Sequence, residues 1–197
     1  MKERKGFFQR YFIDALGAMA QGLFASLIIG TIFGQLAKIP YMGFLTNFTV
    51  HIGDAKSPVI GCAIGVAIAY ALGAQKLTLF TSAVTGALGY ALGGPVGAYV
   101  AAVVGAEVGS LVAGKTKLDI ILIPLGALFL SFAGIFAAYP FIKLIGRLGD
   151  FIAFATDATP FVMGVVIAVV MGVVLTMPTS SAAIWISVAS PILTGYA

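Results

Sequence analysis

Glu107 is the residue of this sequence whose type and surroundings point most directly to chemistry. It is the only carboxylate in the apolar run from Val100 to Ala113, and it stands away from both ends of that run. A charged side chain inside a bilayer normally faces a cavity or a partner, because lipid cannot solvate it. Gly105 and Gly109 flank Glu107 and would let a neighbouring helix or a ligand approach closely. The pattern predicts a ligand-binding carboxylate; the alternative is a Glu paired with a Lys, a Tyr or a backbone group for packing alone.

Two clusters of hydroxyl side chains stand beside apolar runs and are candidate substrate-binding residues. Thr81 and Ser82 form the first, and Thr179, Ser180 and Ser181, which follow Pro178, form the second. Transporters often place their substrates at broken helices, and a proline helps to open such a break. Hydroxyls inside a helix also bond to their own backbone, so a purely local role stays open for both clusters.

Gln21 and His51 complete the set of candidate binding residues. Gln21 shares a polar stripe with Asp14 and Gln35 in the first apolar run. Because lipid cannot satisfy amides, such a stripe turns inward, either for hydrogen bonding between helices or to line a path for a solute. His51 lies three residues before Asp54 in a polar linker, where it is either a proton-linked switch or a solvated loop residue.

Several kinds of chemistry are missing from the sequence. There is no metal-ligand spacing and no Ser-His-Asp order, and the Gly-rich segment 86–97 is not followed by the Gly-Lys-Ser/Thr of a phosphate loop. The single Cys62 lies in an apolar run, which argues against a disulfide framework and a catalytic thiol. We therefore expect no cofactor, no metal, and no catalytic or phosphorylation site of the chain's own.

The composition indicates the class of fold that positions these residues. The 197 residues are 60% hydrophobic and only 9% charged, whereas soluble domains carry about 25% charged residues. So few charges cannot cover a water-facing surface, and lipid must be the main solvent. The 25 glycines suit closely packed membrane helices. The fold class predicted is an all-α, polytopic transmembrane bundle with short or broken helices.

The apolar runs divide this bundle into elements of nearly bilayer length. They predict one transmembrane domain with spans near residues 15–37, 58–74, 77–92, 96–113, 120–138 and 161–177. The linkers 38–56 and 143–157 are amphipathic and are expected at the membrane interface. Gly93, Gly94 and Pro95 predict a tight break between two short antiparallel helices, because glycine permits unusual backbone angles and proline lacks an amide donor.

The distribution of basic residues predicts the orientation of the chain. Of the eleven Lys and Arg residues, seven fall on the side of the N-terminus: Lys2, Arg4, Lys5, Arg10, Lys76, Lys115 and Lys117. Four fall on the other side: Lys38, Lys56, Lys143 and Arg147. Because basic residues concentrate in cytoplasmic loops, the N-terminus and the 115–117 turn are expected inside. The net charge of +4 is therefore an orientation signal and not a sign of nucleic-acid binding.

Pro, Gly and Asp residues recur in a similar order in the two parts of the chain, which suggests an internal parallel repeat. Pro40, Gly53-Asp54 and residues 58–61 resemble Pro140, Gly149-Asp150 and residues 160–164. Repeats of this kind are common in transporters, although chance similarity between apolar segments rich in Gly and Pro is the alternative. If the repeat exists, its second unit is incomplete, and the chain is expected to be the N-terminal part of a longer protein.

Three segments resemble a known family. They are IDALGAMAQGLFASLIIGTI (13–32), GAEVGSLVAGKTKLDI (105–120) and MPTSSAA (177–183). Together they are similar to the perfringolysin-regulator-like membrane proteins, which are grouped with the membrane (IIC) components of the bacterial sugar phosphotransferase system. The resemblance covers most of the chain, and its middle segment is the most specific part.

The resemblance implies a multi-pass, permease-like protein of the bacterial cytoplasmic (inner) membrane, forming a homodimer and taking a carbohydrate as its ligand. The sequence contains no soluble domain with a phosphorylatable Cys or His, so phosphoryl transfer would need separate cytoplasmic phosphotransferase proteins. Two other functions stay open. One is a membrane sensor or regulator of toxin or sugar-responsive expression without transport, and the other is a proton- or ion-coupled carrier or channel that uses Glu107.

Overall fold

The computed structural model describes residues 6–52, 54, 57–115 and 118–158, together with residues 161, 164, 165, 168, 169 and 172. Within these residues the fold is all-α, as predicted. Three described helices are long and apolar enough to cross a membrane, namely Gln9–Leu36, Lys76–Val112 and Asp119–Pro140, and Pro58–Ala71 is a shorter apolar helix. The sixth expected span and the end of the repeat's second unit fall largely outside the described residues, as do Thr179, Ser180 and Ser181.

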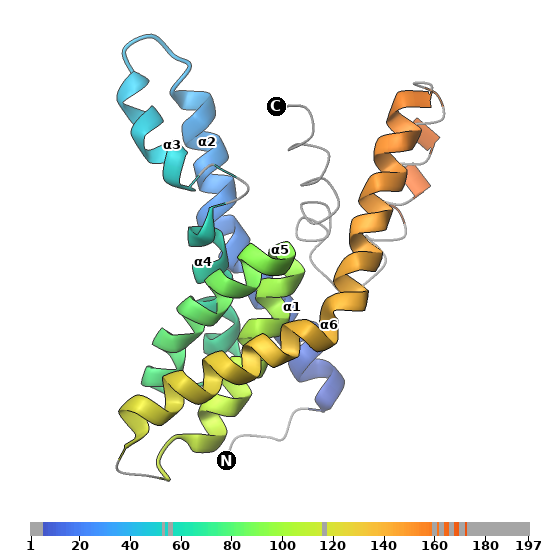
Figure 1. Cartoon of the computed structure of the whole chain (residues 1–197). Helices are drawn as coiled ribbons and strands as arrows, with labels where there is room; N and C mark the ends of the chain where they lie inside the picture. The colour runs from blue at the N-terminus through green and yellow to red at the C-terminus, as the bar shows by residue number, and fades with distance from the viewer. Residues whose placement is uncertain are drawn as a thin grey trace.

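The first membrane helix is a continuous rod made of four segments in succession. These are the π-helix η1 (Gln9–Ala15), α1 (Leu16–Leu23), the π-helix η2 (Phe24–Ile28) and α2 (Ile29–Leu36). The helix begins at Gln9, before the start expected at Ala15, because polar residues of its first turns find partners on other elements. After α2 the chain turns back through η3 (Gly43–Leu45) and α3 (Thr46–Ile52), which lies along α2 in Figure 1.

α4 (Pro58–Ala71) begins at a well-formed N-cap. The Ser57 hydroxyl accepts a hydrogen bond from the Val59 amide at 3.3 Å, and Pro58 occupies the first helical turn. Both features are typical of helix starts, because the cap satisfies a free amide and proline has no amide to satisfy. The same Ser57 hydroxyl donates to the His51 carbonyl, which ties α3 to the start of α4.

α5 (Lys76–Val112) is a helical hairpin rather than one straight helix. Gly93 and Gly94 leave the helical region, with φ/ψ of −150°/23° and 59°/−152°. The positive φ of Gly94 is a conformation that residues with a side chain rarely adopt. Beyond this point the chain runs back on itself, so that Gly89 faces Gly97 with no room for a Cβ on either. The predicted break at Gly93-Gly94-Pro95 is confirmed.

The buried centre of the molecule lies where α4 crosses the hairpin. Gly65 of α4 lies directly against the backbone of Ser82 and Gly86, and Gly61 lies against Gly86 and Tyr90. Around this crossing, Leu23, Ile60, Ile64 and Ile68 are fully buried. Small residues at the crossing let the helix backbones approach, which maximises van der Waals contact where lipid offers no hydrophobic driving force.

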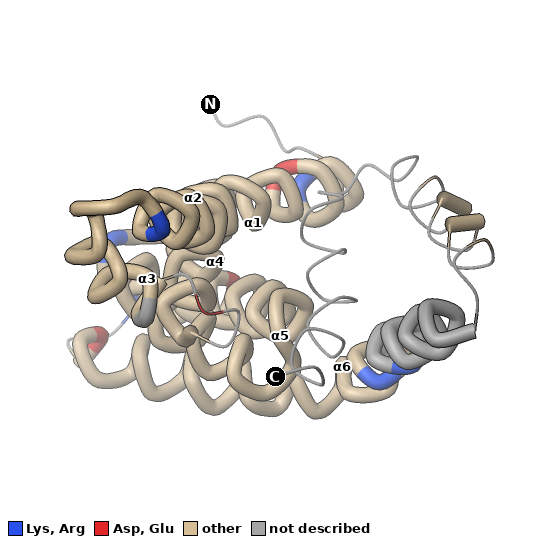
Figure 2. Tube along the Cα trace, turned by 90° about the horizontal axis from the view of Figure 1, so that it is seen from above, with Lys and Arg blue, Asp and Glu red and all other residues tan. Residues whose placement is uncertain are grey.

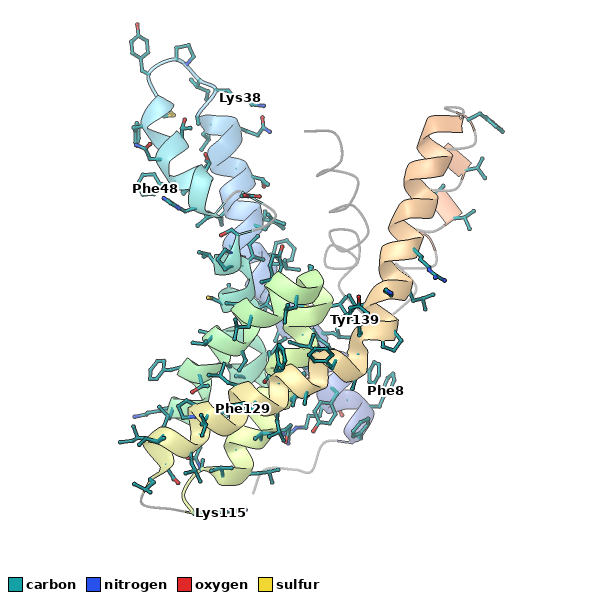
Figure 3. The ribbon with its side chains drawn as sticks, in the orientation of Figure 1. Phe8, Lys38, Phe48, Lys115, Phe129 and Tyr139 are labelled. Atoms are coloured by element: carbon teal, nitrogen blue, oxygen red, sulfur yellow. The ribbon has the colours of Figure 1, made fainter. Side chains whose placement is uncertain are left out.

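α6 (Asp119–Ala158) begins where the Asp119 carboxylate accepts a hydrogen bond from the Gly114 amide at 2.5 Å. Its first part packs across α5, and the helix then bends close to Tyr139 and leaves the bundle (Figures 1 and 3). The helix contains Pro140 and continues through the segment 143–157, which we expected to be a separate amphipathic linker. A proline can bend a helix without ending it, so this segment is a helical continuation.

The tight crossing of α4 and α5 predicts that a larger residue at Gly65 destabilises the protein. Gly65→Ala places a methyl group against the Ser82 carbonyl, and overpacking of this kind costs about 1–3 kcal/mol. The melting temperature of the detergent-purified protein should therefore fall. Gly126→Ala is the matched control on α6, because its Cβ would meet only Val108 Cγ1 at 3.8 Å. Equal melting temperatures for the two variants would contradict the tight crossing.

Candidate functional site

Glu107 forms an ion pair with Arg10. The Arg10 Nη2 lies 2.6 Å from the Glu107 Oε1, and the side chains are 40% and 32% exposed. Arg10 comes from η1 at the start of the first helix, and Glu107 comes from the second half of the α5 hairpin. Figure 2 shows a basic position beside an acidic one at this end of the first helix. The partner of Glu107 is therefore an arginine, a residue type that the sequence reasoning had not considered for it.

An aromatic and apolar hollow lies beside this pair, on the side of Glu107. It has a volume of about 390 Å³ and is lined by Phe7, Tyr11, Val103, Val104, Glu107 and Val108. The Phe7 and Tyr11 rings lie 4.7 Å apart, and the Arg10 guanidinium lies 5.8 Å from the Tyr11 ring. The hollow thus combines one carboxylate with two aromatic rings, and Arg10 lies next to it.

A second contact holds the two sides of the hollow together. The Tyr99 hydroxyl of α5 donates a hydrogen bond to the Tyr11 carbonyl at 2.7 Å. That carbonyl belongs to the π-helical segment η1, and π-helices widen the helix and occur often at functional sites. The ion pair and this hydrogen bond fix the first helix against α5 along the edge of the hollow.

The arrangement can bind a polar, uncharged ligand. A carboxylate accepts hydrogen bonds, a guanidinium donates them, and an aromatic ring face packs against C–H groups. The Arg10 Nε is buried and has no hydrogen-bond partner among the described residues, so only the exposed part of the guanidinium is open to a ligand. Within the same part of the chain, no group of three or more His, Cys, Asp or Glu could hold a metal ion.

The first hydroxyl cluster lies elsewhere and bonds to its own helix. Thr81 donates to the Leu77 carbonyl at 2.9 Å, and Ser82 donates to the Leu79 carbonyl at 2.6 Å. Both side chains are buried, and the Ser82 backbone lies against Gly65. This is the local role that the sequence had left open, and the structure does not bring these hydroxyls to Glu107.

Gln21 and His51 are also separate from the Glu107 hollow. Gln21 is exposed on α1. The His51 side chain is exposed at the end of α3, far from the N-terminal end of the first helix in Figure 1. The residues that sequence reasoning missed at the hollow are Arg10, Tyr11 and Phe7. Their one signal was the interruption of an otherwise apolar N-terminal run by Arg10.

The Arg10–Glu107 ion pair is expected to stabilise the fold. Arg10→Gln and Glu107→Gln should each lower the melting temperature, because each leaves one charge without its partner. The double variant should lose less than the sum of the two, with a coupling of about 0.5–3 kcal/mol. The measurement is a double-mutant cycle of thermal unfolding in detergent micelles. Additive effects would mean that the two charges do not stabilise each other.

Comparison with known proteins places the chain in a family. Residues 13–197 match the family described as Phosphotransferase system, EIIC. No curated protein matches the chain, and no solved structure matches it. The match supports the grouping with the membrane components of the phosphotransferase system but not the narrower perfringolysin-regulator-like name. Its apolar helices and this match over nearly its whole length make the chain an integral membrane protein that belongs to the EIIC family, the permease components of the phosphotransferase system.

Proposed function

We propose that the chain binds a carbohydrate in the hollow beside Arg10 and Glu107 and carries it across the bacterial cytoplasmic membrane. The Arg10–Glu107 pair is the observation that carries this proposal. A charged acceptor, a charged donor and aromatic rings lie close together there. Membership in the EIIC family supports a sugar as the class of ligand.

The chemistry of a sugar fits this set of side chains. Sugar hydroxyls can donate to the Glu107 carboxylate and accept from the Arg10 guanidinium, and both bonds are strengthened by charge. The C–H face of the ring can lie on Phe7 or Tyr11, whose rings are in contact with each other on one wall of the hollow. A neutral ligand leaves the local charge balance unchanged, since the arginine and the carboxylate compensate each other.

The ion pair also gives a way for the empty site to stay stable in a membrane. Two unpaired charges facing acyl chains would be costly, so the pair holds the site closed in the absence of a ligand. A sugar replaces part of this contact with its own hydrogen bonds and loosens the link between η1 and α5. Neutralisation by Arg10 argues against Glu107 as a bare proton or cation site.

The proposed role as a sugar permease of the phosphotransferase system also implies its protein partners. The ligand would be phosphorylated by separate cytoplasmic phosphotransferase proteins, and the chain would function as a homodimer. We place the N-terminus inside. In support of this, the 2.6 Å contact between Arg10 and Glu107 puts the start of the first helix beside the last part of α5, so both basic segments share one side.

Uptake by reconstituted protein tests the proposed function. Liposomes containing the purified chain should accumulate one member of a labelled panel of hexoses, hexitols and disaccharides. Accumulation should increase when the soluble phosphotransferase proteins and a phosphoryl donor are enclosed. A sugar that shifts the melting temperature but is never taken up would favour the sensor over the permease.

Glu107→Gln tests the role of the carboxylate in binding. The amide keeps the shape but loses a charge-assisted hydrogen bond, so affinity for the transported sugar should fall about five- to tenfold. The double variant with Arg10→Gln is the control, because it removes the unpaired arginine. It should regain stability without regaining affinity, as measured by calorimetry. Wild-type affinity in Glu107→Gln would contradict a ligand contact.

Cysteine labelling tests the orientation. In a Cys62→Ala background, Gly6→Cys and Lys115→Cys should react with an impermeant maleimide only after the cells are opened. Met42→Cys, in the turn between α2 and α3, should react in intact cells, since it lies beyond the other end of the first helix. The reverse pattern would place the N-terminus outside.

A further inference from the structure

Two side chains on one face of the α5 hairpin reach across to the start of the first membrane helix. Tyr99 donates its hydroxyl to the Tyr11 carbonyl at 2.7 Å, and Glu107 accepts from the Arg10 guanidinium at 2.6 Å. Tyr99 and Glu107 share this face with Val103, which stands between them at intervals of four residues. On α5 the two contacts start about 12 Å apart, yet on η1 they end on adjacent residues.

The Tyr99 contact holds the backbone of η1 rather than one of its side chains. Its acceptor is a main-chain carbonyl, so the hydrogen bond fixes where the π-helical segment lies relative to α5. Because π-helices are rare, contacts with neighbouring elements have to hold this segment in place. α4 packs against both η1 and α5, and the Tyr99 hydrogen bond joins those two elements directly.

The contacts described for the Arg10 side chain hold its charged end. Its Nη2 contacts Glu107, while its Nε is buried with no hydrogen-bond partner among the described residues. The two charged side chains are 40% and 32% exposed, and exposed ion pairs contribute little when long, flexible side chains have to be ordered to form them. The Arg10–Glu107 pair therefore depends on a backbone that already presents the guanidinium to the carboxylate.

We propose that Tyr99 is a positioning residue for the Arg10–Glu107 site. By holding the Tyr11 carbonyl, it fixes the backbone beside Arg10, so that the guanidinium meets Glu107 and the Tyr11 ring lines the hollow. A backbone that is ordered in advance lowers the entropy that the ion pair and a bound ligand would otherwise lose. The residues that line the hollow do not include Tyr99, so it acts through Tyr11 and not on the ligand. Its effect on ligand binding rests on the proposed function, whereas its effect on the ion pair does not.

A comparison of two double-mutant cycles tests the effect on the ion pair without a ligand. The cycle of Arg10→Gln and Glu107→Gln is measured by thermal unfolding of the full chain in detergent, once with Tyr99 and once with Tyr99→Phe. Because Tyr99→Phe removes only the hydroxyl, a change in the coupling reports the lost hydrogen bond. The coupling between the two charges should fall by about half or more. An equal coupling in both backgrounds, including none in either, would overturn the proposal.

Tyr90→Phe is the matched control, because Tyr90 is also a tyrosine of α5 but lies against Gly61 of α4, outside the hollow. It should leave the Arg10–Glu107 coupling unchanged even where the melting temperature falls. A loss of coupling as large as that in Tyr99→Phe would mean that general loosening of the bundle is responsible, and the proposal would be wrong.

Sugar affinity separates this inference from the proposed function. For the hexose, hexitol or disaccharide that the wild type accumulates, Tyr99→Phe should lower affinity about three- to tenfold, as measured by calorimetry well below the melting temperature. Tyr90→Phe should keep the wild-type affinity. Reduced coupling with unchanged affinity would support the positioning of the ion pair and contradict the hollow as the sugar site. Reduced affinity with unchanged coupling would overturn the positioning role and leave the proposed function standing.

Discussion

The need of each polar group for a partner in a lipid solvent governs this structure. Arg10 and Glu107 are charged side chains on different helices, and each is the partner of the other, with Nη2 and Oε1 2.6 Å apart. Thr81, Ser82 and Thr85 of α5 satisfy this need locally, by donating to carbonyls of their own helix. The cost of an unsatisfied polar group in hydrocarbon is several kcal/mol, so each such pairing constrains where a helix can lie.

Close packing of glycines supplies the second constraint and positions the site. The hairpin at Gly93 and Gly94 returns the second half of α5 along the first half, and Gly65 brings α4 against it. Glu107 therefore projects from a helix that is held on two sides, toward the first membrane helix and Arg10. The site is rigid where the hairpin carries it, and its other wall is a π-helical segment joined through one ion pair and one hydrogen bond.

The sequence predicted features that depend on neighbouring residues and missed those that depend on distant ones. The break at Gly93-Gly94-Pro95 was predictable because backbone freedom is a local property. The partner of Glu107 was not, because Arg10 lies 97 residues away and the two meet only because α4 packs against both the first helix and α5. The segment 143–157 was expected to be an amphipathic linker, yet the helix α6 continues through it.

Depth in the membrane separates the two polar positions of greatest interest. Glu107 lies near the end of α5 and is one third exposed beside a hollow, so its hydrogen bonds can be exchanged with a solute that arrives from that side. Gln21 lies at the middle of its helix, and its side chain is exposed. A polar group at the first position can serve binding because its partner is replaceable.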